Sequence, residues 1–135
     1  MADDATERII GAAIEVHRHL GPGLLESIYE GALCHEMDLR NLKYQRQLEV
    51  PVRYKEVILQ GQRLDLLVEN EIVVEIKAVR AMNEVFVAQT LSYLKATGLQ
   101  RALLINFGEK RLAQGIRRLS LYLRDLCGKK VLKKC

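Results

Sequence analysis

The chain has 135 residues, of which 49% are hydrophobic and 28% are charged, and its formal net charge is +4. These values predict one globular domain, residues 1–135, that is large enough for a hydrophobic core of its own. Its three cysteines, Cys34, Cys127 and Cys135, form no C-x-x-C pair, which argues against a disulfide framework or a zinc site and for a reducing, cytoplasmic compartment. We expect no secretory signal and no membrane partner, because no apolar run approaches the roughly 18–20 residues that cross a bilayer.

The first two predicted elements are helices, because apolar residues recur at the spacing of one helix face. The first runs from about Thr6 to Leu20 and stops at the Gly-Pro-Gly of residues 21–23, since neither Gly nor an interior Pro continues a helix. The second runs from about Leu24 to Arg40. His17 lies on the apolar face of the first helix, where we expect a core histidine rather than a metal ligand.

The middle of the chain predicts three strands joined by turns, at about Tyr44–Tyr54, Ile58–Val68 and Ile72–Val79. Pro51 gives the first of them an edge or bulged position, because proline cannot donate to a ladder. Together the three strands predict an antiparallel meander.

The last third of the chain predicts a helix, a strand and a helix. The helix at about Asn83–Thr97 ends before a glycine, which is a common residue just after a helix C-terminus. Arg101–Phe107 is nearly all apolar and is typical of a strand in a sheet interior. Apolar residues at helical spacing predict a final helix at about Lys110–Leu126. The order α-α-β-β-β-α-β-α indicates a mixed α/β fold.

Residues 127–135 form a basic tail with four lysines. We expect it to be flexible and solvated, as chain ends often are, and a phosphate-binding arm is the alternative.

Two carboxylates and one ammonium occur among the aliphatic residues of the second and third strands. A tight turn centred on Asn70 would place Asp65 opposite Glu75, and period-two alternation would put Lys77 on the same face as Glu75. Like charges opposite each other destabilise a sheet, and burial makes the ionised pair worse. The pair therefore calls for positive charge, from Lys77 and from a divalent cation such as Mg²⁺ or Mn²⁺, which prefer hard oxygen ligands.

The opposite face of the same hairpin is aliphatic and must lie in the core; it carries Leu64, Leu66, Val68, Val74 and Ile76. The alternative to a metal site is a sheet whose polar face meets water, with Lys77 bridging the two acids. From the spacing alone the two interpretations are about equally supported.

The pattern D-x9-E-x-K, formed by Asp65, Glu75 and Lys77, resembles the signature of the PD-(D/E)XK nuclease superfamily. Leu64 stands where the superfamily name has proline. The stretch GLLESIY at residues 23–29 resembles the motif of the GxxExxY protein family, which is classed with those nucleases. The resemblance extends over about residues 9–119 and implies a restriction-endonuclease-like α-β-β-β-α-β core, with a four-stranded mixed sheet flanked by helices.

The resemblance also implies roles for single residues. Asp65, Glu75 and the Ile76 carbonyl, completed by Glu26, would hold the metal, and Lys77 would lie near the attacking water. Without the resemblance, Glu26 would be read as a favourable charge at a helix start.

Gln89 and Tyr93 resemble the Q-x-x-x-Y pattern of the RecB-like branch of these nucleases. At i and i+4 they share one helix face, which would present an amide and a phenol to the site. Their alternative is an ordinary pair at the core edge. We expect Tyr29 to be a packing residue whose hydroxyl orients a neighbouring acid.

The function that the resemblance implies is metal-dependent hydrolysis of phosphodiester bonds in nucleic acid, with DNA as the first expectation. A core of this size that cuts duplex would suit a homodimer. The alternative is a non-catalytic nucleic-acid-binding or protein-interaction module that retains the nuclease fold. Its support is the low aromatic content of 5% and the scattered basic residues.

Overall fold

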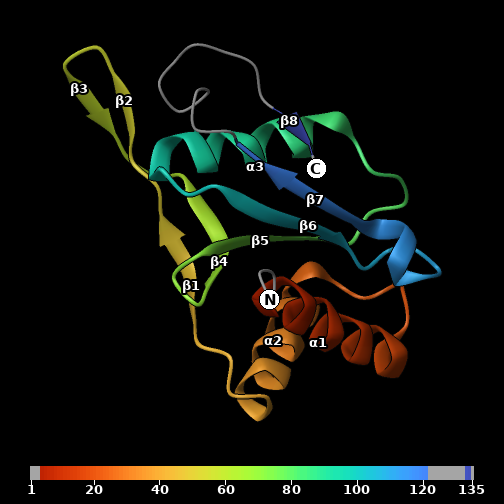
Figure 1. The fold of residues 1–135 in the computed structure, drawn as a ribbon. Coiled ribbons are helices and arrows are strands. Elements are labelled where there is room, and N and C mark those ends of the chain that lie inside the picture. The colour runs from red at the N-terminus through yellow and green to blue at the C-terminus, as the bar shows by residue number, and fades with distance from the viewer. Residues whose placement is uncertain (1–3, 122–132, 135) are drawn as a thin grey trace.

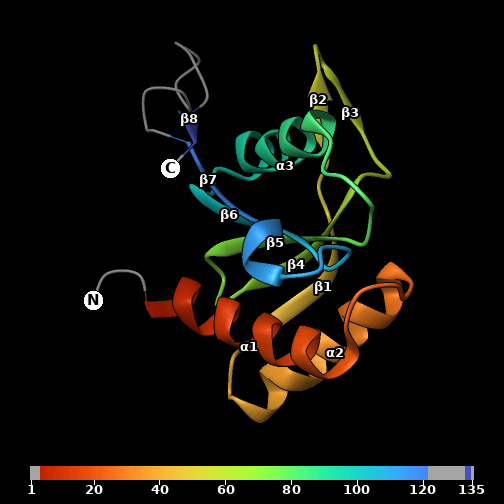
Figure 2. The same cartoon turned by 90° about the vertical axis from the view of Figure 1, so that its right-hand side faces the viewer.

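The computed structural model describes residues 4–121 and 133–134. These residues form three layers, with a mixed sheet in the middle, helices α1 and α2 on one face and helix α3 on the other (Figure 1). Figure 2 shows the same layers from the side, with a small hairpin standing out from them. The fold is the mixed α/β, restriction-endonuclease-like arrangement that the sequence predicts.

The three helices lie where the apolar spacing predicts them. Their bounds are Asp4–Leu20 for α1, Glu26–Leu39 for α2 and Glu84–Thr97 for α3. Helix α3 has well-formed ends, because the side chain of Asn83 accepts a hydrogen bond from the Val85 amide and Gly98 adopts a left-handed φ of 78°. His17 is buried, and its Nε2 lies 2.8 Å from the Glu109 carbonyl oxygen, as expected of a core histidine.

The main sheet has the strand order β1-β4-β5-β6-β7-β8. The bounds of these strands are Tyr44–Glu49, Arg63–Val68, Ile72–Lys77, Arg101–Asn106, Ile116–Ser120 and Lys133–Lys134. Strands β5 and β6 are parallel, and the other neighbours are antiparallel. The first four of these strands, together with α2 and α3, are the predicted core, and β7 and β8 extend it.

The first predicted strand, Tyr44–Tyr54, is divided in two at Val50 and Pro51. Beyond this break, β2 (Val52–Tyr54) and β3 (Val57–Leu59) form a two-stranded hairpin apart from the main sheet. The amide of Val50 bonds to the Gln62 carbonyl at the base of the hairpin, whereas Pro51 has no amide to donate.

The predicted helix at Lys110–Leu126 is wrong over its described part. Residues Leu112–Gly115 form a 3₁₀ turn, and Ile116–Ser120 pair with β6 as strand β7. Apolar residues three and four apart fit a helix, but the open edge of β6 provides a ladder for the same residues. Residues 122–126 lie outside the described part, and so does the predicted tail except for Lys133 and Lys134, which form β8.

The two faces of the sheet belong to two cores. The core under α1 and α2 contains the sheet residues Leu66, Val68, Ile72, Val74, Ile76, Leu103 and Ile105. The core under α3 contains Leu67, Val73, Ala102, Leu104 and Leu119. The alternation predicts Leu64 on the α1 side, but Leu64 packs in the α3 core. The change of side coincides with an interruption of the β1–β4 ladder at Asp65.

Candidate active site

The candidate site lies where β4 and β5 part. The antiparallel pairs of these strands run from Val68↔Ile72 to Leu66↔Val74 and stop there. One residue further, the side chains of Asp65 and Glu75 replace the ladder. The Asp65 amide donates to Glu75 Oε2 at 2.7 Å, and the Ile76 amide donates to Asp65 Oδ2 at 2.8 Å. Each acid thus satisfies a backbone donor of the opposite strand, and the two carboxylates are held close together.

Both carboxylates are in surroundings that disfavour their charged form. Glu75 is only 3% exposed, and its burial, reinforced by the charge of Asp65, raises its pKa to about 8. Asp65 is half-buried, and burial raises its pKa as well, against the hydrogen bond from Ile76. The site therefore has a shortage of positive charge.

Lys77 supplies part of that charge. Its charge lowers the pKa of Glu75, although burial and Asp65 outweigh it. Its ammonium lies 4.5 Å from the centre of the Phe86 ring, a cation–π contact. Among the described side chains, no salt bridge joins Lys77 to either acid.

Glu26 reaches the same place from the first turn of α2. Burial raises the pKa of Glu26, the charge of Lys77 and the backbone amide of Ala78 lower it, and the charge of Asp65 raises it further. Its carboxylate therefore interacts with the groups at the ends of β4 and β5. The structure brings four of the predicted site residues together: Glu26, Asp65, Glu75 and Lys77.

The loop before α2 is held by Tyr29. Its hydroxyl donates to the Gly21 carbonyl and accepts from the Leu24 amide, and its ring stacks on Phe107 with centroids 4.7 Å apart. Gly21 and Gly23 both have left-handed φ values, 66° and 109°, which glycine adopts without strain. Tyr29 thus packs in the core and fixes the loop that leads to Glu26. Both of these bonds are to main-chain atoms, and neither is to the acid that its hydroxyl was expected to orient.

Helix α3 brings Tyr93 to the acids. Tyr93 is 2% exposed, and burial, followed by the charges of Glu75 and Asp65, raises its pKa to about 12. Gln89, one turn earlier, is exposed, and its side chain makes no hydrogen bond to any residue in the described part of the chain. Of this predicted pair, one residue therefore interacts with the cluster.

The PD-(D/E)XK nuclease superfamily matches residues 3–119. The chain belongs to this superfamily. No curated protein and no solved structure matches the chain. None of the helices within residues 4–121 is long and apolar enough to cross a membrane.

Members of this superfamily generally use divalent metals, so the carboxylates of this site are its candidate metal ligands. Within the described residues, no group of three or more His, Cys, Asp or Glu side chains is arranged to hold a metal ion. Mg²⁺, however, is usually held by one or two carboxylates, with water and substrate phosphate completing its ligands. Two close carboxylates with raised pKa values fit an ion of that kind.

Two further residues at the site escaped the sequence reasoning. The Gln47 side-chain amide donates to Glu30 Oε1 at 3.0 Å and to Asp65 Oδ1 at 3.3 Å, so it connects the two acids. Glu30 also pairs with Arg46 at 3.2 Å. The position of Glu30, one turn after Glu26, was a usable signal. Gln47 offered none, because its φ of 51° is unusual for a glutamine in a strand.

Proposed function

We propose that the chain is a divalent-metal-dependent nuclease that hydrolyses phosphodiester bonds in nucleic acid. The observation that carries the proposal is the close pair of Asp65 and Glu75, with the pKa of Glu75 raised to about 8 and the charge of Lys77 acting on it. A scaffold without chemistry has no need of such strain. Superfamily membership supports the same activity.

The finer assignment is to the GxxExxY family. Its support is the stretch GLLESIY, in which Glu26 interacts with the acidic cluster and Tyr29 fixes the loop before it. The proposal treats residues 1–135 as a single nuclease domain.

The residues would divide the work as follows. Asp65 and Glu75, with the Ile76 carbonyl, would hold Mg²⁺ or Mn²⁺, and Glu26 would complete the ligands through water. Such an ion polarises a phosphate and lowers the pKa of bound water. Lys77 would stabilise the negative charge that develops as the water oxygen attacks phosphorus and the P–O bond to the leaving group breaks.

Helix α3 would supply the remaining two groups. The phenol of Tyr93, whose pKa is raised to about 12, stays protonated at neutral pH and can donate a hydrogen bond toward the acids. The exposed amide of Gln89 is available to the substrate. DNA is the proposed substrate, and a homodimer is the proposed assembly.

Cleavage of labelled single-stranded DNA, duplex DNA and RNA, with Mg²⁺, with Mn²⁺ and with chelator, tests the proposal. We expect metal-dependent products from the wild type and a loss of at least about 100-fold for Lys77→Ala, since one charge-stabilising group contributes about that much. Glu75→Gln should also be inactive, and Lys43→Ala, an exposed change away from the acids, should match the wild type.

Equal cleavage by the wild type and Glu75→Gln would assign the activity to a contaminant. The absence of cleavage on every substrate would favour the second candidate, a non-catalytic binding module. The observation in its favour is the lack of a three-membered metal-holding group in the described part of the chain.

A further inference from the structure

The β2–β3 hairpin exposes apolar side chains that the rest of the described chain leaves uncovered. It is made of two three-residue strands, paired from Val52↔Leu59 to Tyr54↔Val57, and it stands clear of the three layers (Figures 1 and 2). Its large apolar residues are 39–60% exposed: Val52, Tyr54, Val57, Ile58 and Leu59. Two-stranded hairpins are marginally stable alone. A binding partner that covers these apolar side chains would explain why the hairpin exposes them.

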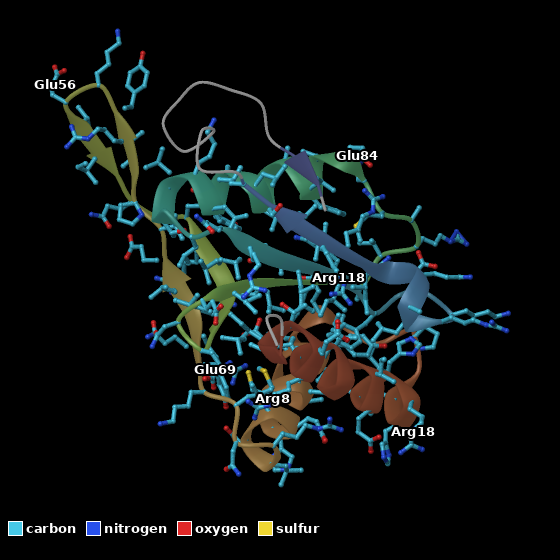
Figure 3. All side chains as sticks on the ribbon, viewed as in Figure 1. Arg8, Arg18, Glu56, Glu69, Glu84 and Arg118 are labelled. Carbon is cyan, nitrogen blue, oxygen red and sulfur yellow. The ribbon has the colours of Figure 1, made fainter. Side chains whose placement is uncertain are left out.

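A groove of about 750 Å³ separates the hairpin from the C-terminal half of α3. Among the residues that the structure describes, its lining has apolar, polar and basic side chains and no carboxylate: Pro51, Val52, Arg53, Ile58, Gln62, Ser92, Lys95 and Ala96. The acid of the hairpin, Glu56, lies at the far tip and is not part of the lining (Figure 3). The groove therefore combines an apolar wall with cations.

The two cations of the groove are available to an anion. Lys95 makes no hydrogen bond or ion pair with the residues that the structure describes. Arg53 donates through Nη1 to the Lys55 carbonyl at 3.2 Å, which leaves its charge without an acidic partner in the same set of residues. A phosphate is an anion that suits both side chains.

The groove adjoins the candidate active site. Gln62 lines it, and Asp65 follows three residues later, so their Cα atoms are at most about 10 Å apart. On α3, Ser92 lines the groove and the next residue, Tyr93, interacts with the acids. A nucleic-acid strand with one phosphate at the acids could therefore continue into the groove.

We propose that this groove binds unpaired nucleotides of the strand to be cut, so that the substrate is single-stranded beside the scissile phosphate. Arg53 and Lys95 take the phosphates, and the wall formed by Val52 and Ile58 takes the faces of the bases. A duplex hides the faces of its bases in the stack, whereas single-strand binding combines a positive groove with side chains, usually aromatic, against which exposed bases stack. In this groove the aliphatic wall would take the place of the aromatic side chains. The inference rests on the proposed function, because it names the substrate class of that site.

Binding without cleavage tests the proposal. The full chain carrying Glu75→Gln is titrated, without divalent metal, onto a fluorescent single strand of roughly 20 nucleotides, which is longer than one such groove spans. The same titration is made onto a blunt duplex of the same sequence. Fluorescence anisotropy measures binding at several salt concentrations. We expect the single strand to bind at least tenfold more tightly. Arg53→Ala with Lys95→Ala should reduce the slope of log K against log salt by about 1.4, since each phosphate contact on a single strand contributes about 0.7.

An apolar variant and a charge control separate the two parts of the groove. Ile58→Ser should weaken single-strand binding severalfold and leave the salt slope unchanged. Lys43→Ala removes an exposed cation that does not line the groove and should change neither quantity. Tighter binding of the duplex, or groove variants that behave like Lys43→Ala, would overturn the proposal.

The outcome is distinguishable from failure of the proposed function. If the wild type cuts nucleic acid but the groove variants bind normally, this inference falls and the nuclease proposal stands. If the wild type cuts nothing but the groove variants lose single-strand binding, the groove stands and the chain is a binding module.

Discussion

Glu75 should make the metal-free protein less stable as the pH rises. Its pKa is about 8 in the folded chain, above its ordinary value of 4.5, so the folded state retains a proton that the unfolded state has lost. The stabilisation is complete below about pH 4.5 and is lost as the pH rises toward 8, by at most about 1.4 kcal/mol per pH unit. Thermal melts in chelator between about pH 5 and 9, which bracket this change, measure it.

The control for this pH dependence is the isosteric amide. Glu75→Gln keeps an oxygen for the Asp65 amide but cannot ionise, so its melting temperature should fall less with pH in this range than that of the wild type and be higher at about pH 8. Glu56→Gln, at the exposed hairpin tip, should follow the wild type. Parallel curves of melting temperature against pH for the wild type and Glu75→Gln would contradict the raised pKa of Glu75.

The hydrogen bonds that the Gln47 side chain donates can be tested separately from the backbone strain at this residue. Gln47→Gly and Gln47→Ala both remove the amide that connects Glu30 to Asp65. Only glycine adopts the φ of 51° without cost, so the glycine variant should be the more stable by about 1 kcal/mol. Both should reduce Mn²⁺-dependent cleavage to a similar extent. A full rate in Gln47→Gly would mean that the amide does not orient Asp65.

The loop between α1 and α2 should loosen when the Tyr29 hydroxyl is removed. Tyr29→Phe keeps the stack on Phe107 and loses the bonds to the Gly21 carbonyl and the Leu24 amide. Urea unfolding should show a loss of about 1–2 kcal/mol. Because Glu26 begins the helix that this loop leads into, the variant should also need more Mn²⁺ for half-maximal cleavage. Tyr54→Phe, on the exposed hairpin, should change neither value.

At the level of elements, capping and turn residues correctly predicted the ends of a helix and the centre of a hairpin, because local interactions determine both. Asn83 and Gly98 mark both ends of α3, and Asn70 centres the β4–β5 turn as its spacing indicated. The same reasoning failed for Ile116–Ser120, whose apolar spacing also fits a helix. Pairing with β6, between residues well apart in the chain, determines that strand. Tertiary context of this kind overrides propensity and is not visible in a short window.

The residues of the candidate site also differ in whether local sequence signals could predict them. Asp65, Glu75 and Lys77 follow from strand register, and Glu26 was found through a motif. Gln47 could not be found, because its contact with Asp65 depends on a backbone angle that its side chain does not signal. The exchange of hydrogen bonds between the carboxylates and the opposite backbone was also out of reach, since register alone predicts a ladder that continues.

For the whole molecule, we expect a divalent ion to raise the melting temperature. The unfolded chain cannot hold Asp65 beside Glu75, so the ion binds the folded state, which gains about 2.7 kcal/mol at a hundredfold excess over Kd. Mn²⁺ should act at lower concentration than Mg²⁺, which gives up its water reluctantly. Differential scanning fluorimetry across metal concentrations measures both.

Three variants test whether the rise in melting temperature with metal depends on the residues of the candidate site. Asp65→Asn and Glu75→Gln should abolish it, whereas Lys77→Ala should keep or strengthen it, because a competing cation is removed. A wild-type protein whose melting ignores millimolar Mn²⁺ would remove the metal from the proposed function.

The crossed bonds at the parted end of β4 and β5 have a consequence for how such a chain can change in evolution. Each acid satisfies a main-chain donor of the other strand, so neither can be replaced by an aliphatic residue without leaving a backbone amide unpaired, at a cost of about 1–3 kcal/mol. Asparagine and glutamine avoid that cost, since each keeps an oxygen in place. We therefore expect a homologue that has lost catalytic activity to carry Asp65→Asn or Glu75→Gln. An amide at either position would then mark descent from an active protein.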